Sequence, residues 1–149
     1  MQKGYTTVTL TDVIESLTAG KILPPKPIVI TFDDGYRDFY YYAYPILRQN
    51  NQRATVFVIT QLLEGGDYLT WEQLRELSGN SLITIGSHTL SHRSLTSITP
   101  IEVKNEIVSA RNILQENLGI TVNTFAYPYG SYNGEVEKVL RESGFTAAV

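Results

Sequence analysis

The sequence of 149 residues contains no cysteine, one methionine, one tryptophan and only two histidines. The absence of cysteine excludes disulfides, thiolate metal ligands and a cysteine nucleophile. No stretch approaches the ~20 consecutive apolar residues of a membrane-spanning helix. Residues 1–5 do not lead into the apolar region of a signal peptide. The sequence therefore predicts a domain without disulfides and without a membrane span.

Charge of either sign is also modest. Twelve basic and 15 acidic residues give a net charge of -3, and neither sign forms a long run. Nucleic-acid binding normally requires a clustered basic face, so nucleic acid is not an expected partner. A hydrophobic content of 42% is typical of a globular domain. We therefore expect residues 1–149 to form one domain.

Short apolar runs that are rich in valine, isoleucine, threonine and aromatic residues alternate with helical patterns along the chain. The six runs are residues 5–10, 28–32, 54–59, 82–85, 122–127 and 145–149. Alternation of this kind predicts right-handed crossovers and a mainly parallel sheet, either open or curled toward a barrel. Six strands are too few for a complete eight-stranded barrel.

Capping signals mark two helix starts. Thr99 and Glu102 form one predicted capping box, Thr70 and Gln73 form another, and Gly119 suits the left-handed position that ends a helix. Apolar residues follow Thr99 at intervals of three or four, which predicts one buried helical face. They are Val103, Ile107, Ala110, Leu114 and Leu118.

Two further helices are predicted from other signals. Asn133 and Gly144 bracket a helical pattern near the end of the chain. Around residue 40, Pro45 should kink or restart a helix. The predicted buried face of that helix consists of Phe39, Tyr42, Ala43 and Ile46.

Polar side chains follow three of the apolar runs. Asp33 and Asp34 come after the second run, His88 and His92 after the fourth, and residues 128–130 after the fifth. In parallel α/β folds, the carboxyl ends of the strands carry the functional site. We therefore expect two carboxylates, two imidazoles and a turn at one rim of the sheet.

Adjacent side chains of an extended strand point in different directions, so Asp33 and Asp34 can face different parts of a site. One can bind a metal while the other remains free, and Gly35 lets the backbone turn sharply. The alternative interpretation is a simple polar turn between a strand and a helix.

His88 and His92 are four residues apart, so both imidazoles can face one point from a helical turn or a compact loop. The alternative is a pair of structural, hydrogen-bonded histidines. Two imidazoles and one carboxylate would leave positions open for water, whose pKa falls from about 15.7 toward about 7 on such an ion. Asp33 could then act as the base.

Residues 31–35 (Thr-Phe-Asp-Asp-Gly) and 88–92 (His-Thr-Leu-Ser-His) resemble the first two motifs of the polysaccharide deacetylases, the NodB-homology enzymes of carbohydrate esterase family 4. Residues 125–130 (Phe-Ala-Tyr-Pro-Tyr-Gly) resemble the third motif. Ala126 stands where many members have arginine. In this respect the third motif is most similar to that of the poly-N-acetylglucosamine deacetylases.

This resemblance implies roles for individual residues. Asp33 would be the general base, and Asp34, His88 and His92 would be the metal ligands. The backbone N–H of Tyr129 would donate a hydrogen bond to the oxyanion of the tetrahedral intermediate. By the same resemblance, the substrate would contact the third motif at Tyr127, Pro128 and Tyr129.

The implied fold is a distorted, incomplete (β/α) barrel. The implied reaction is hydrolysis of N-acetyl groups on an N-acetylglucosamine-type polysaccharide, with release of acetate. The implied cofactor is one divalent metal ion, zinc or alternatively cobalt or nickel. The family also suggests an extracellular or cell-envelope location, whereas no oligomeric state is predicted.

Family members usually supply a later histidine that protonates the leaving amine, and no third histidine is present. We therefore expect the domain to be truncated at its carboxyl end and consider truncation at its amino end as well, and we expect the chain to turn over slowly. General acid–base catalysis is typically worth about 10²–10⁴-fold.

Two other functions use similar residues. A two-histidine, one-carboxylate site can hold Fe(II) for oxygen chemistry, although the usual His-x-Asp spacing is not seen. A non-catalytic carbohydrate-binding or scaffold module could retain the same metal pocket. A Ser-His-Asp hydrolase is disfavoured because neither histidine follows a nucleophile-elbow motif.

Overall fold

The computed structural model describes residues 3–149, which form two parallel sheets. The smaller sheet pairs β1 (Thr6–Thr7) with β2 (Pro27–Ile28). The larger sheet has five parallel strands in sequence order. These are β3 (Thr31–Phe32), β4 (Ala54–Val58), β5 (Ile83–Ser87), β6 (Thr124–Phe125) and β7 (Ala147–Ala148).

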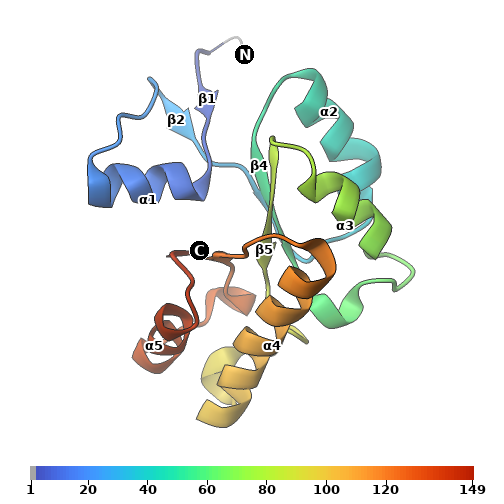
Figure 1. Cartoon of the computed structure of the whole chain (residues 1–149), viewed down its shortest axis with the longest axis vertical. Coiled ribbons are helices and arrows are strands. Elements are labelled where there is room, and N and C mark those ends of the chain that lie inside the picture. The colour runs from blue at the N-terminus through green and yellow to red at the C-terminus, as the bar shows by residue number, and fades with distance from the viewer. Residues whose placement is uncertain (1–2) are drawn as a thin grey trace.

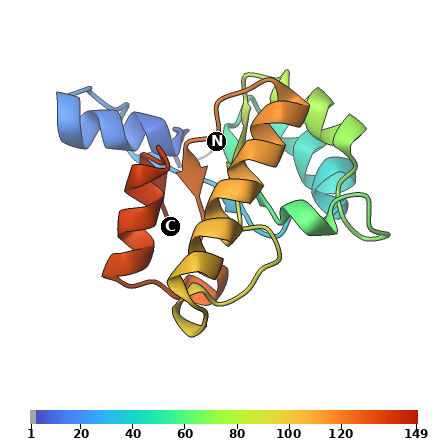
Figure 2. The same cartoon turned by 60° about the horizontal axis from the view of Figure 1, so that its bottom comes forward.

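Helices follow one another around the outside of the larger sheet in chain order, and Figure 2 shows α2 to α5 in an arc. Helix α4 packs against both α3 and α5. The five α-helices are α1 (Leu10–Ala19), α2 (Tyr44–Gln49), α3 (Trp71–Ser78), α4 (Pro100–Leu118) and α5 (Gly134–Glu142).

Helix α1 lies on the other side of the strands from α2 and α3 (Figure 1). Its first residue, Leu10, packs with Phe57, Ala126 and Ala147 in a small cluster that is separate from the main core. The main core lies between the strands and the outer helices. The sheet therefore curls around a small apolar interior, which confirms the predicted incomplete, mainly parallel barrel.

The predicted helix boundaries follow the capping signals. Thr99 and Thr70 each complete a capping box, and Asn133 accepts hydrogen bonds from the first turn of α5. Gly119 ends α4 with φ 66°. A fourth signal was missed: Thr9 and its capping-box partner start α1, so the predicted strand 5–10 ends at Thr7.

The run 28–32 was predicted as one strand, but it divides between the two sheets. Ile28 ends β2, and Thr31 begins β3. Between them, Val29 packs against the inner cluster and Ile30 against the main core. An apolar run predicts burial but does not specify which strands it pairs with, so the crossing between sheets was not apparent.

The predicted buried face of residues 39–46 was wrong in part. Phe39 is buried, but Tyr42 and Ile46 are exposed, and Tyr44 and Leu47 are buried instead. Residues 39–43 form a π-helix, in which the N–H of residue 44 bonds to the carbonyl oxygen of Phe39. This wider turn shifts the helical period. The restart predicted near residue 45 is confirmed by the beginning of α2.

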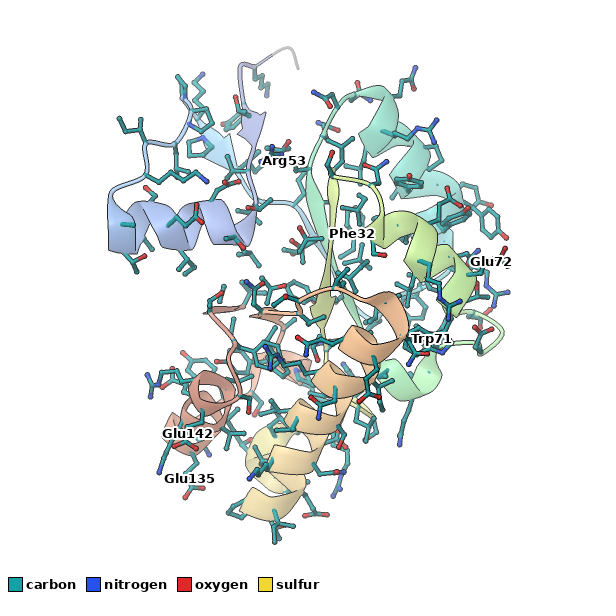
Figure 3. The ribbon with its side chains drawn as sticks, viewed as in Figure 1. Phe32, Arg53, Trp71, Glu72, Glu135 and Glu142 are labelled. Carbon is teal, nitrogen blue, oxygen red and sulfur yellow. The ribbon has the colours of Figure 1, made fainter. Side chains whose placement is uncertain are left out.

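Two labelled side chains in Figure 3 mark the interior and the amino end of the strands. Phe32 lies at the centre, where its ring meets that of Phe39 edge to face at 4.8 Å. Arg53 precedes β4 and lies toward α1, where it forms an ion pair with Asp12 at 3.2 Å. Over residues 3–149, no helix is long and apolar enough to cross a membrane.

Candidate metal centre

Two loops at the carboxyl ends of the strands bring Asp34, His88 and His92 together. Asp34 lies just beyond β3, and His88 immediately follows β5. The Nε2 atoms of the two histidines are 3.2 Å apart, and each lies 3.5 Å from Asp34 Oδ1. The two predicted ligand-bearing segments therefore meet at one point, although β4 separates their strands in the sheet.

The size of this triangle fits a first-row divalent ion. Bonds of about 2.0–2.2 Å in a tetrahedral arrangement place neighbouring ligand atoms about 3.4 Å apart. The three observed separations of 3.2, 3.5 and 3.5 Å lie close to that value. Two imidazoles and one carboxylate are also the donor set of catalytic zinc sites that keep a position open for water.

A hydrogen bond fixes the orientation of His88. Its Nδ1 lies 2.8 Å from the carbonyl oxygen of Ala126, which can only accept, so Nδ1 carries the proton and Nε2 keeps its lone pair. The side chain is 3% exposed, and burial lowers the pKa of His88 because the charged form is desolvated. A neutral imidazole is thus presented toward Asp34.

The turn after β3 is tight and left-handed. Asp34 has φ 70°, and Gly35 has φ 77°. A Cβ on Gly35 would lie 2.9 Å from Val58 Cγ1, so the turn requires glycine on both conformational and steric grounds. Asp33 and Asp34 were expected to point in different directions because both would be extended. Asp34 is instead left-handed, so this turn sets the direction of its side chain.

Asp33 precedes Asp34 in the chain and is not one of the three corners of the triangle. Its side chain is exposed. Its negative charge acts to raise the pKa of His88, against the larger effect of burial. The structure therefore places Asp33 close enough to influence a ligand electrostatically.

The loop of residues 88–92 has an unusual backbone. Thr89 and His92 have φ values of 68° and 64°, which are uncommon for residues other than glycine. Thr89 Oγ1 accepts a hydrogen bond from the His92 N–H at 2.9 Å. The buried Glu106 of α4 also bonds to this loop. Sequence reasoning missed Glu106 because the helical period predicted only an apolar face there.

The three predicted substrate contacts in the third motif lie in different surroundings. The Tyr129 ring is 4.8 Å from the His92 ring, and the side chain is 74% exposed. Pro128 is buried. Tyr127 stacks on Tyr132 at 5.0 Å, and burial raises its pKa. Of the three predicted substrate contacts, Tyr129 is thus the side chain that packs against a predicted metal ligand.

A hollow of about 480 Å³ lies elsewhere, near the amino ends of β4 and β5. Its polar lining includes Asp12, which already forms ion pairs with Lys21 and Arg53. None of the three predicted metal ligands lines this hollow. The volume of a hollow alone therefore does not identify the functional site.

Comparison with known proteins agrees with the geometry. The family model described as polysaccharide deacetylase matches residues 20–148. YxkH of Bacillus subtilis strain 168, which is named for the same family, is 34% identical over 146 residues, or 98% of this chain and 52% of its own length. The poly-beta-1,6-N-acetyl-D-glucosamine N-deacetylase of Escherichia coli K12 is 25% identical, over 97% of this chain and 28% of its own length.

Among solved structures, the Streptococcus pyogenes deacetylase PplD in complex with acetate superposes with a TM-score of 0.91. It is 28% identical in sequence, and the match covers 97% of this chain and 65% of PplD. The chain thus spans about half, or less, of the length of the two curated relatives.

Proposed function

Because the chain belongs to the polysaccharide deacetylase family, we propose that it hydrolyses N-acetyl groups on an N-acetylglucosamine-type polysaccharide and releases acetate. One observation carries the proposal: the ligand atoms of Asp34, His88 and His92 form a triangle of the size that a divalent ion needs. Two relatives support the substrate class, since one is named for poly-N-acetylglucosamine and another was solved with acetate.

The proposed cofactor is one zinc ion, with cobalt or nickel as alternatives that suit the same donors. When bound, such an ion polarises the substrate carbonyl and lowers the pKa of water. The chain's own part is to hold two imidazoles and one carboxylate in place. The hydrogen bond from His88 to Ala126 contributes to that by fixing the ring.

Asp33 is the proposed general base. It is adjacent to Asp34 in the chain, is not a corner of the ligand triangle, and is exposed, so its carboxylate remains available to take a proton from water. The backbone N–H of Tyr129 is the proposed donor to the oxyanion. A donor of this kind is typically worth about 2.7–4 kcal/mol of transition-state stabilisation.

Protonation of the leaving amine requires a further acid. Both histidines of the sequence belong to the ligand triangle. Without general acid catalysis, residues 1–149 alone should turn over about 10²–10⁴-fold more slowly than an enzyme that has the acid. A longer chain that adds a histidine-bearing segment should be faster, and equal rates would remove this part of the proposal.

The direct test is acetate release from β-1,6-linked and β-1,4-linked N-acetylglucosamine oligomers, measured on metal-free protein with and without added zinc or cobalt. Activity that depends on the metal is the expected result. Asp33→Asn should abolish turnover and spare metal binding. Metal binding without acetate release from any oligomer, in both the short and the longer chain, would favour a non-catalytic carbohydrate-binding module.

A further inference from the structure

Glu106 is a carboxylate inside the apolar face of α4. It is 4% exposed and lies next to the fully buried Ile107. In the described part of the chain, no lysine, arginine or histidine forms an ion pair with it. A buried carboxylate without hydrogen bonds is strongly unfavourable, so its partners must offset the loss of water.

All three hydrogen bonds to Glu106 come from the loop that carries the histidines. The N–H groups of Leu90 and Ser91 donate to Oε2 at 3.1 and 2.8 Å. The Ser91 hydroxyl donates to Oε1 at 2.5 Å. Hydrogen bonds to a charged acceptor are about twice as strong as those between neutral groups. Both carboxylate oxygens are therefore used to hold the segment between the two ligands.

This loop needs such support because its own conformation is unfavourable. Left-handed backbone is unfavourable for residues other than glycine, and the loop contains two such residues, Thr89 and His92. The segment after β4 also bonds to this loop, because the N–H groups of Thr60 and Gln61 donate to the carbonyl oxygens of Thr89 and Leu90. Two segments outside the loop thus hold it, and Glu106 of α4 does so through its side chain.

We propose that Glu106 is a positioning residue for the metal centre, an inference that rests on the proposed metal site. Its carboxylate holds residues 88–92 in the shape that brings both Nε2 atoms within 3.5 Å of Asp34. Loss of the carboxylate leaves the ligands present but no longer arranged before the ion binds. Outer partners of this kind typically change metal affinity by about 10–100-fold.

The experiment compares metal affinity in Glu106→Ala, Glu106→Gln and Ser91→Ala with that of the unmodified chain. Zinc is titrated into metal-free protein by calorimetry, and thermal unfolding is followed in parallel. Glu116 provides the matched control, because it is exposed and lies on the same helix. We expect Glu106→Ala to bind zinc about 10–100-fold more weakly than the unmodified chain. The zinc affinities of Glu106→Gln and Ser91→Ala should lie between these two values. Glu116→Ala should bind zinc as tightly as the unmodified chain.

Amide hydrogen exchange of Leu90 and Ser91 in the metal-free protein gives a second readout, which does not depend on the metal site. Faster exchange at these two amides in Glu106→Gln is the expected result. If the unmodified chain binds no zinc, the proposed function fails, whereas the positioning of the loop is still decided by exchange. Unchanged affinity and unchanged exchange in folded Glu106→Gln would overturn the inference. If Glu106→Ala does not fold, Ser91→Ala decides by the same two criteria.

Discussion

His88 donates a hydrogen bond from Nδ1 to the carbonyl oxygen of Ala126 at 2.8 Å, which ties the loop after β5 to the chain that leaves β6. The acceptor is a backbone atom, so the identity of the side chain at position 126 does not affect it. The Ala126 side chain instead packs with Leu10 and Phe57 in the inner cluster. The departure from the arginine of many family members therefore leaves the orientation of His88 intact.

Asp34→Asn should remove metal binding without unfolding the domain. Asparagine tolerates the positive φ of this position, but it lacks the negative charge. We expect a loss of zinc affinity of at least about 100-fold, more than is typical of an outer partner. Calorimetric titration measures it. Asp38→Asn, at an exposed position in the same segment, should behave as the unmodified chain, and a normal affinity in Asp34→Asn would remove Asp34 from the ligand set.

Gly86→Ala should destabilise the domain through a steric clash. A Cβ at this position would lie 2.4 Å from Phe57 Cδ1 and 2.8 Å from Thr124 Oγ1. Overpacking of a buried site typically costs about 1–3 kcal/mol. Denaturant unfolding should show that loss. Gly134→Ala serves as the control, because a Cβ there meets nothing within 4 Å. Equal stabilities for the two variants would contradict the packing of β5 against Phe57.

The capping box of α4 predicts a specific acid dependence. Hydrogen bonds from Thr99, followed by that from Arg93, lower the pKa of Glu102 from 4.5 to about 2. Because the pKa is lower in the folded state, this stabilisation is complete above pH 4.5 and declines as the pH falls toward 2. Glutamine can replace glutamate in a capping box but does not titrate.

The test is the difference in free energy of unfolding between the unmodified chain and Glu102→Gln. It should favour the unmodified chain near neutral pH and shrink between pH 4.5 and 2. A difference that stays constant over this range would show that the Glu102 carboxylate is not held in its charged form by the cap.

Tyr129→Gly separates the backbone of this residue from its ring. Glycine accepts φ 60° readily and keeps the N–H group to which the oxyanion role is assigned. We expect stability to be unchanged or slightly higher, and kcat for acetate release to remain within about tenfold. A loss near the 10²–10³-fold typical of a missing oxyanion donor would assign the role to the ring. Tyr132→Gly controls for the loss of an exposed tyrosine away from His92.

The rim of the site could be predicted from sequence because parallel strands end on one side of a sheet. The positions of Asp34 and His88 at this rim followed from the predicted strands that precede them in the chain. Helix starts were predictable where capping boxes are local, as at Thr99. What was missed depends on distant partners: Glu106 looks like a misplaced charge on an apolar helix face until the loop that contacts it is known.

The prediction of which side chains are buried in residues 39–47 failed for a different reason. One π-turn shifts every later position of the helix, so Tyr44 and Leu47 are buried in place of Tyr42 and Ile46. The division of 28–32 between sheets likewise depends on where β1 lies. The local sequence pattern predicts whether a segment is a helix or a strand, whereas the segments that it pairs or packs with depend on the whole fold.

Two of the three corners of the metal triangle, Asp34 and His92, sit on left-handed backbone. Their separation is therefore set by main-chain turns as well as by flexible side chains. Calcium takes six to eight oxygen ligands at about 2.3–2.6 Å, so it would have to widen the triangle against both turns and accept two nitrogens. We therefore expect the proposed site to prefer small ions that bind nitrogen ligands over calcium.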